Sequence, residues 1–264
     1  MTVDDTLTLT LPRILCLHGG GVNGTVFRLQ CRTIIAQLAR TFRLVFMDAP
    51  YASRPHRDIA AVYGELGPFY RWLAWSPEEP GLPPSAGPDD IMDACLAAMA
   101  RDAGSGPWVG VLGFSQGAKV AASLLWAQQR AEADAQTLPP RTSFKFGVLM
   151  AGSAPVLHLD RRLPRPPHVA STAVFSTSFD DYPDPAAPAR GPHVLRVPTL
   201  HVHGLQDPGL PRHRALLHTY CEPGTTRLVE WHAGHRLPIK TADVQAIVAQ
   251  LLDMATETGA LPRS

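Results

Sequence analysis

The residues best suited to chemistry are a serine set between two glycines. The segment 113–117 reads Gly-Phe-Ser-Gln-Gly, follows a short apolar run and precedes a helical pattern. In such a strand–turn–helix unit the glycines let neighbouring backbones approach, and the serine hydroxyl stands at the end of the strand. The first amides of the helix point to where negative charge develops during acyl transfer. The pattern predicts that Ser115 is a nucleophile, and the structural alternative is a glycine turn with a capping serine.

A serine alcohol needs a base, and the base needs a carboxylate that orients it. In hydrolases whose serine lies in such a strand–turn–helix unit, called a nucleophile elbow, the expected order along the chain is serine, then Asp or Glu, then His. Asp207 follows an apolar run at 197–202, and His235 lies in the loop after the run at 226–231. We therefore predict a catalytic triad of Ser115, Asp207 and His235. The rivals, which we expect to lie in loops or on the surface, are Asp180, Asp181, Asp184 and His232.

Two backbone amides must bind the oxyanion that such a reaction creates. One is expected from Gln116, directly after the nucleophile, and the other from Gly20 or Gly21 in the glycine-rich turn after the first apolar run. A flexible glycine turn or a phosphate loop is the alternative. A phosphate loop would require a lysine after its last glycine, and residues 22–25 contain none. His18 is expected to brace this turn and not to take part in the chemistry.

Aromatic residues are concentrated between the early strands and the serine. They could line an acyl pocket, because binding sites are mostly apolar, or they could pin a long loop to the core. From this region and from the serine motif, we take Tyr70, Trp72 and Phe114 as candidate substrate contacts, although Phe114 would fit the core as well. The aromatic residues of this region are Tyr51, Tyr63, Phe69, Tyr70, Trp72 and Trp75.

The elements that must position these residues alternate between strand and helix. Because the strands are continuous apolar runs, they predict a mostly parallel sheet with helices on both faces, an α/β fold. Strands are expected at 13–17, 43–47, 108–114, 144–150, 197–202 and 226–231, and helices at 27–40, 89–103, 118–133, 211–220 and 241–256. The stretches 51–88 and 155–196 are expected as irregular, cap-like insertions in one domain that spans 1–264.

Composition narrows the class of protein. The chain has 264 residues and a formal net charge of +1, which gives no electrostatic reason to expect nucleic acid or an anionic membrane as partner. The four cysteines are scattered, so no disulfide, metal site or cofactor is expected. Neither a signal peptide nor an apolar membrane span is evident, and a cytoplasmic enzyme is the expectation. Proline is unusually frequent, with 26 residues that cluster in the two insertions and in loops.

With these residues in place, the sequence resembles the fungal serine hydrolase family of α/β-hydrolases over about residues 12–252. Within that family it is most similar to the stand-alone thioesterases of fungal polyketide biosynthesis, of the lovastatin-pathway type. The matching pieces are the segments 17–23 with Phe27 and Gln30, 48–50, 113–117, 203–204 with Asp207, and 234–235 with Pro238. Val22 and Ala233 depart from the pattern but lie outside the predicted triad.

The resemblance implies that a polyketide acyl chain is cleaved from the phosphopantetheine thioester of an acyl carrier domain of a polyketide synthase, without cofactor or metal. The same residues would serve a carboxylesterase acting on a small-molecule oxoester, so the sequence leaves both open. Release of the acyl chain by cyclisation is a further alternative. An inactive hydrolase fold used for binding is disfavoured, because all three triad candidates are present.

Overall fold

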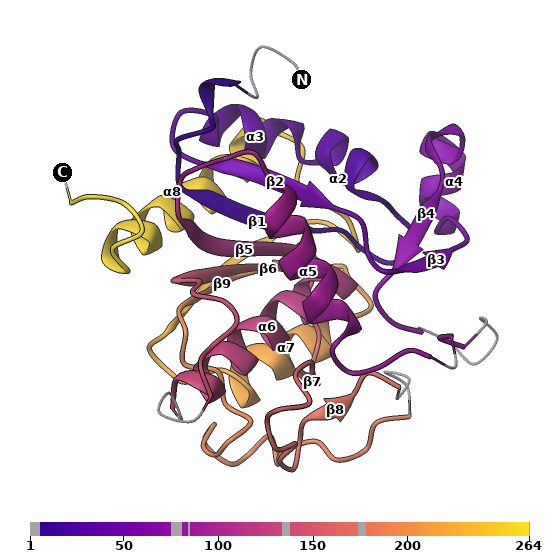
Figure 1. The fold of residues 1–264 in the computed structure, drawn as a ribbon, viewed down its shortest axis with the longest axis vertical. Helices are drawn as coiled ribbons and strands as arrows, with labels where there is room; N and C mark the ends of the chain where they lie inside the picture. The colour runs from indigo at the N-terminus through magenta and orange to yellow at the C-terminus, as the bar shows by residue number, and fades with distance from the viewer. Residues whose placement is uncertain (1–5, 75–80, 84, 134–137, 174–177, 264) are drawn as a thin grey trace.

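A computed structural model describes residues 6–74, 81–83, 85–133, 138–173 and 178–263 of the chain. A six-stranded sheet forms its centre (Figure 1). The aromatic residue Trp75 lies outside the described residues, so its predicted place in the aromatic cluster stays a prediction. The strands are β1 (Arg13–Leu17), β2 (Arg43–Met47), β5 (Trp108–Phe114), β6 (Phe146–Met150), β9 (Thr199–Gly204) and β10 (Thr226–Trp231).

The strands lie in the order β10-β9-β6-β5-β1-β2, and every pair in the sheet is parallel. The chain builds outward from β1 to β2 and then returns to place β5 on the other side of β1. In open parallel sheets, ligands bind outside the carboxyl ends of the strands near such a reversal. The segment 113–117 begins at the carboxyl end of β5, so the fold places the predicted nucleophile at this point.

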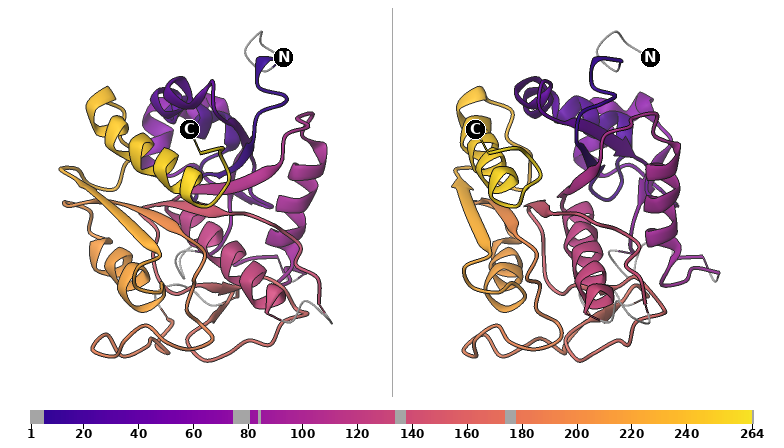
Figure 2. Two further views of the ribbon diagram at one scale, coloured as in Figure 1. Left: turned by 90° about the vertical axis from the view of Figure 1, so that its left-hand side faces the viewer. Right: turned by 60° about the vertical axis from the view of Figure 1, so that its left-hand side comes forward.

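Helices cover both faces of the sheet (Figures 1 and 2). One face carries a core with residues from α5 (Asp90–Arg101) and α6 (Gln116–Glu132), and the other carries residues from α2 (Gly24–Gln30), α3 (Arg32–Leu38) and α8 (Thr241–Glu257). α7 (Leu210–Thr219) contributes Leu216 to the first core. Burial on both faces explains why β5 and β6 read as unbroken apolar runs.

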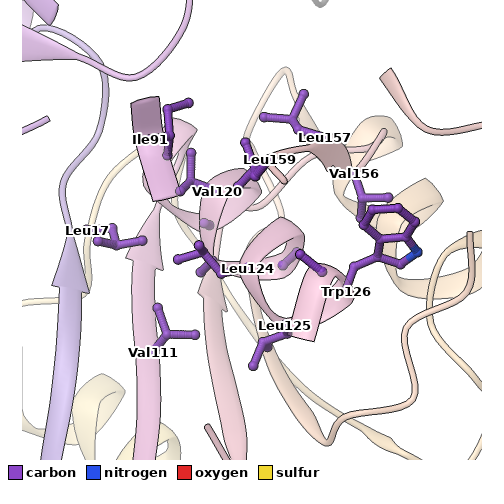
Figure 3. Packing of buried hydrophobic residues seen from close by; sticks show 14 of the residues in the cluster. Leu17, Ile91, Val111, Val120, Leu124, Leu125, Trp126, Val156, Leu157 and Leu159 are labelled. Atoms are coloured by element: carbon purple, nitrogen blue, oxygen red, sulfur yellow. The ribbon is translucent and has the colours of Figure 1, made fainter. Parts of the chain in front are cut away.

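The core beside α6 joins the sheet to the second insertion. Leu124 and Val120 of α6 lie between Val111 of β5 and the segment 156–159, as Figure 3 shows. The side chains of this segment, Val156, Leu157 and Leu159, are at most 2% exposed. The insertion is therefore anchored by apolar packing directly behind the helix that begins at the serine.

The expected helix over 27–40 is wrong as a single element. Cys31, with φ −83° and ψ 7°, ends α2 and begins α3. This bend lets Phe27 of the first helix and Ile34 and Leu38 of the second reach the same buried core. Apolar spacing on both sides of a short break cannot be distinguished from one continuous stripe in the sequence. The other expected helices and strands are present, with ends shifted by a few residues.

The stretch 51–88 is more regular than expected. It forms an antiparallel pair of β3 (Tyr51–Ser53) and β4 (Phe69–Arg71), joined through α4 (Arg57–Tyr63) and a 3-10 turn, η1 (Gly64–Leu66). Strands of three residues are too short to show a periodic pattern, which is why the sequence indicated a loop. In the second insertion, the described residues 155–173 and 178–196 contain only the two-residue strands β7 (Leu157–His158) and β8 (Ala170–Ser171).

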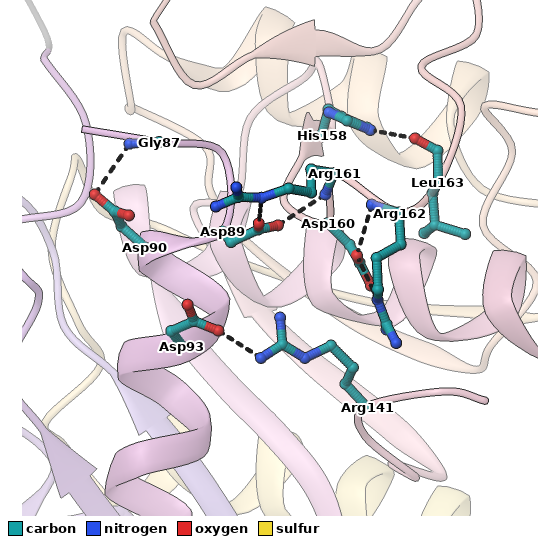
Figure 4. Close-up of polar contacts among 10 residues, drawn as sticks. All are labelled: Gly87, Asp89, Asp90, Asp93, Arg141, His158, Asp160, Arg161, Arg162 and Leu163. Carbon is teal, nitrogen blue, oxygen red and sulfur yellow. Dashed lines mark hydrogen bonds and ion pairs between the residues drawn. The ribbon is translucent and has the colours of Figure 1, made fainter. Parts of the chain in front are cut away.

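Ion pairs lie where the second insertion and the loop before β6 meet the start of α5 (Figure 4). The buried carboxylate of Asp89 accepts the backbone N–H of Arg161 at 2.7 Å and pairs with the same residue's guanidinium. Asp160 binds the Arg162 guanidinium at 2.6 Å, and Asp93 pairs with Arg141. The Asp89–Arg161 contact joins the insertion to the start of α5, whereas the Asp160–Arg162 pair lies within the insertion; both carboxylates are almost fully buried.

Candidate active site

Ser115 occupies a strained turn between β5 and α6. Its φ of 55° and ψ of −117° lie in a region that non-glycine residues rarely adopt. A Cβ on Gly113 would lie 2.2 Å from the carbonyl oxygen of Gly117, and one on Gly117 would lie 2.1 Å from that of Leu17. Only glycine fits at either position, and this accounts for the spacing of the motif.

The three residues of the predicted triad form one hydrogen-bonded chain. His235 Nε2 lies 2.9 Å from Ser115 Oγ, and His235 Nδ1 lies 2.7 Å from Asp207 Oδ2. Asp207 is almost fully buried, and its second oxygen accepts the backbone N–H of Gly209 at 2.8 Å. With Nδ1–H donated to the carboxylate, Nε2 is free to accept the serine proton, which is the arrangement a general base needs.

Loops after β9 and β10 bring the acid and the histidine together. Leu205 donates its N–H to the carbonyl of Trp231, and Gln206 donates to that of Ala233, both at 2.9 Å. Because β9 and β10 are neighbouring parallel strands, their carboxyl ends meet at one edge of the sheet. The position of His235 relative to Asp207 is thus set by main-chain hydrogen bonds between the two loops.

The glycine-rich turn lies directly against the nucleophile. A Cβ on Gly19 would lie 3.6 Å from the Cβ of Ser115, so the two backbones are close. Gly21 already donates its N–H to the carbonyl of Tyr70 at 2.9 Å, which excludes it as an oxyanion donor in this conformation. Of the two glycines expected from the sequence, Gly20 is the remaining candidate, together with the amide of Gln116 at the start of α6.

His18 braces this turn, as the sequence indicated. Its Nδ1–H donates to the carbonyl of Gly19 at 2.6 Å, and its Nε2 accepts the N–H of Ala49 at 3.0 Å. Burial lowers the pKa of His18 to about 4, so the ring stays neutral and keeps both bonds at neutral pH. His18 therefore links the ends of β1 and β2 by hydrogen bonds and has a structural role.

Gln116 performs a second task that the sequence did not reveal. Its side-chain oxygen accepts the N–H groups of Trp72 at 3.1 Å and Leu73 at 3.3 Å, and its amide donates to the Leu73 carbonyl at 3.3 Å. These bonds tie the end of the first insertion to the first residue of α6. The motif alone gives no signal for this contact, because its partners lie more than forty residues earlier.

The three candidate substrate contacts differ in their surroundings. Trp72 is completely buried and donates its indole N–H to the His18 carbonyl at 2.8 Å, so it packs inside the protein in this structure, and its contact with substrate stays a prediction. Tyr70 is half-buried, and its backbone pairs with Val22. Phe114 is partly buried, with its ring centre 5.1 Å from that of His235. Tyr70 and Phe114 thus remain candidates, and Phe114 directly precedes the serine.

The rival residues lie in other contacts. Asp181 accepts the N–H of His168, and Asp184 accepts that of Ala186 within the second insertion. His232 lines a hollow together with residues such as Leu237 and Lys240, and none of the predicted triad residues contributes to that hollow. The structure therefore favours Asp207 over these rival acids and His235 over His232.

Buried histidines behind the acid were missed by sequence reasoning. The rings of His203, on β9, and His213, on α7, have their centres 5.6 Å apart, and His213 Nδ1 lies 4.0 Å from Asp207 Oδ2. Burial holds the pKa of both below the ordinary value for histidine. The spacing of six residues between Asp207 and His213 was a signal that could have drawn attention to this pair.

Comparison with known proteins places this geometry in a family. A family model described as "Serine hydrolase (FSH1)" matches residues 7–247. The chain belongs to this serine hydrolase family. The hydrolase is 45% identical over 258 residues to "Esterase claE" of Penicillium crustosum, with 97% of both chains covered. It is 47% identical over 267 residues to "Esterase pigG" of Monascus ruber, with 98% of this chain and 97% of that protein covered.

Solved structures agree on the fold. The hydrolase superimposes on the carboxylesterase of Bacillus cereus with a TM-score of 0.51 and 13% identity, covering 94% of this chain and 91% of the other. Acyl-protein thioesterase 2 of Zea mays gives a TM-score of 0.50 at 19% identity, with 93% and 94% covered. At such identities the likeness shows the α/β-hydrolase fold and nothing finer, and it confirms the fold class expected from the sequence. Among the described residues, no helix is long and apolar enough to cross a membrane.

Proposed function

We propose that this hydrolase releases a polyketide acyl chain from the phosphopantetheine thioester of an acyl carrier domain, using Ser115, His235 and Asp207 as its catalytic triad. The observation that carries the proposal is the hydrogen-bonded chain from Ser115 Oγ through His235 to the buried Asp207 carboxylate. A chain of this kind activates serine toward an acyl carbon, whether the leaving group is a thiol or an alcohol.

In the first half of the reaction, Ser115 Oγ attacks the acyl carbonyl while His235 Nε2 accepts the hydroxyl proton. Asp207 accepts the hydrogen bond that His235 Nδ1–H donates and stabilises the imidazolium that forms. The backbone amides of Gln116 and Gly20 donate to the oxyanion, and Gln116 stands at the positive end of the α6 dipole. His235 then returns its proton to the leaving group, and an acyl-serine remains.

In the second half, water replaces the leaving group. His235 takes a proton from this water, the hydroxide attacks the acyl-serine carbonyl, and the proton passes to Ser115 as the acid departs. Atoms and charges balance without a cofactor. The 40% exposure of the His235 side chain leaves it open to solvent from one side, as the hydrolytic step requires.

The thioester is preferred because of the sequence motifs shared with thioesterases of polyketide pathways, above all residues 17–23 and 234–238. The second candidate is a carboxylesterase that removes an acyl group from a small-molecule oxoester. It is favoured by the names of the relatives, which are esterases claE, pigG and citA. Both candidates use the same three residues, so the leaving group and not the triad decides between them.

The carrier domain and the compartment belong to the same proposal. A carrier domain delivers its acyl chain on a flexible arm, so the partner need only dock near the carboxyl edge of the sheet. All four cysteines are free and buried, which is compatible with the reducing cytoplasm, and we propose that compartment. Nucleic acid and membranes are not part of the proposal.

The deciding experiment presents one medium-chain acyl group in two forms, as a pantetheine thioester and as a matched oxoester, and compares kcat/KM. Ser115→Ala serves as the control for background hydrolysis of each. A thioester preference well beyond the intrinsic reactivity difference supports carrier release. Equal or faster turnover of the oxoester supports the carboxylesterase, and turnover of neither form by the wild type would contradict both.

A further inference from the structure

His213 is a buried polar residue beside the triad that the proposed mechanism does not use. Its side chain is 2% exposed, and its Nδ1 has no hydrogen-bond partner among the described residues. The nearest acceptor, Asp207 Oδ2, is 4.0 Å away, beyond hydrogen-bond distance. An unpartnered buried nitrogen is unfavourable, so the place of this one close to a carboxylate calls for an explanation.

His213 faces the carboxylate as part of a three-residue group. One ligand atom each of Asp207, His213 and His235 lies within 4.8 Å of the others. From Asp207 Oδ2 the distances are 2.7 Å to His235 Nδ1 and 4.0 Å to His213 Nδ1. Tetrahedral ligands at about 2.0–2.2 Å from a zinc ion stand roughly 3.3 Å apart, a value between these two distances. Small side-chain shifts would therefore open one distance, close the other and admit an ion.

The donor set selects the kind of ion. Two imidazole nitrogens and one carboxylate oxygen suit Zn²⁺ better than Mg²⁺ or Ca²⁺, which prefer shells made only of oxygen. Three protein ligands also leave a fourth position for water, as in open zinc sites. That position would lie toward His235, whose side chain is 40% exposed, while Asp207 and His213 are buried. The ion can therefore enter the site from solvent on the exposed side of His235.

The loop that carries the acid also holds His213 in place. A Cβ on Gly209 would lie 2.8 Å from His213 Nε2 and 3.2 Å from Asp207 Oδ1, so glycine allows the imidazole and the carboxylate to pack on the same turn. His213 belongs to α7, which begins at Leu210 directly after this turn. The two ligands are therefore preorganised by one short segment of the chain.

We propose that Asp207, His213 and His235 bind Zn²⁺ and that the bound ion reversibly inhibits the hydrolase. The ion takes the lone pair of His235 Nδ1, and the proton of that nitrogen moves to Nε2, so no proton is lost. With Nε2 protonated, Ser115 Oγ has no base to accept its hydrogen. The bound ion would thus inhibit the triad and would not act as a cofactor. The inhibition rests on the proposed function of His235.

The first test measures binding and not activity. Isothermal titration with ZnCl₂ is run on metal-free wild type and on Ser115→Ala, which lacks the nucleophile but keeps all three ligands. We expect one ion per chain in both proteins. Titration with Co²⁺ adds a second readout, because tetrahedral Co²⁺ absorbs visible light strongly. Binding in both proteins together with a wild type inactive on every ester would preserve the site and overturn only the proposed function.

The second test measures inhibition with a simple chromogenic ester, with each variant compared with its own metal-free activity. We expect Zn²⁺ to inhibit wild type, EDTA to restore activity, and His213→Asn to raise the Zn²⁺ concentration for half-inhibition by at least about tenfold. The matched control is His203→Asn, which alters a neighbouring buried histidine outside the three-residue group and should leave that concentration unchanged.

Three results would overturn the proposal. These are the absence of a one-to-one Zn²⁺ site in wild type, equal inhibition of wild type and His213→Asn, and an equal loss of inhibition in His203→Asn. If His213→Asn does not fold, Asp207→Asn and His235→Asn replace it in the titration. Retention of stoichiometric Zn²⁺ binding by both of these variants would contradict the proposed ligands in the same way.

Discussion

Gly204, at the end of β9, passes so close to Ala233 that a Cβ on the glycine would lie 2.5 Å from the Ala233 carbonyl oxygen. This contact sets the distance between the loop that carries Asp207 and the loop that carries His235. We expect Gly204→Ala to push the loops apart and to lower kcat/KM about a hundredfold, because displacements near 1 Å at a reacting centre have that effect. Ester hydrolysis and urea unfolding of the same samples would measure it.

Gly234, one residue farther along the second loop, provides a matched control for that prediction. A Cβ there would meet only the Gln206 carbonyl oxygen at 3.8 Å, an ordinary contact. Gly234→Ala should therefore keep kcat/KM within a few-fold of wild type. Equal losses in Gly204→Ala and Gly234→Ala would show that glycine flexibility, and not the close approach of the loops, is what the site needs.

Ser115→Ala should remove nearly all turnover while the fold is retained. In a comparable serine hydrolase, loss of the nucleophile lowers kcat by about 10⁶. The variant should fold, because it keeps Gly113 and Gly117 and therefore the close backbone contacts of the elbow. Steady-state rates on any accepted ester, with circular dichroism as the check of folding, would test this. Residual activity above about a hundredth of wild type would exclude Ser115 as the nucleophile.

The sequence predicted the parallel sheet and the positions of Ser115, Asp207 and His235, because each follows one of the strands that the alternation of strands and helices indicates. It could not predict the contacts that the first insertion makes with the residues around the serine. The bond from Gly21 to Tyr70, which removes that amide from the oxyanion site, depends on how the first insertion folds back. The burial of Trp72 also depends on how the first insertion folds back. In the sequence, an aromatic residue that lines a pocket cannot be distinguished from one that fills a core.

The Gln116 side chain should hold the first insertion against the nucleophile. Gln116→Ala leaves the backbone amide in place but removes the acceptor for the N–H groups of Trp72 and Leu73. We expect a loss of about 1–3 kcal/mol in the free energy of unfolding, the cost of unpaired buried donors. Gln116→Glu keeps an accepting oxygen and should lose less. Urea denaturation of the three proteins would check the order, and equal stability of Gln116→Ala and wild type would contradict it.

The buried histidines should make the hydrolase sensitive to acid, and His201 is the clearest case. Its side chain is fully buried on β9, where desolvation, with smaller contributions from His203 and His218, lowers the pKa to about 3. Below the ordinary pKa of about 6.5, the unfolded chain binds a proton at this residue that the folded protein does not bind. The free energy of unfolding therefore falls as the pH drops from about 6.5 toward 3. At pH 5 this residue alone should cost about 2 kcal/mol.

His201→Gln isolates that contribution, because glutamine does not titrate and can still reach Thr199, which contacts His201 Nε2 at 3.1 Å. We expect the loss of unfolding free energy between about pH 7.5 and pH 5 to be smaller in the variant than in wild type by about 2 kcal/mol. Carboxylates such as Asp102 and Asp160, whose pKa values their arginine partners lower, contribute equally in both proteins and cancel in the comparison. Identical pH dependence in the two proteins would mean that His201 is protonated in the folded state, although its Nδ1 has no hydrogen-bond partner among the described residues.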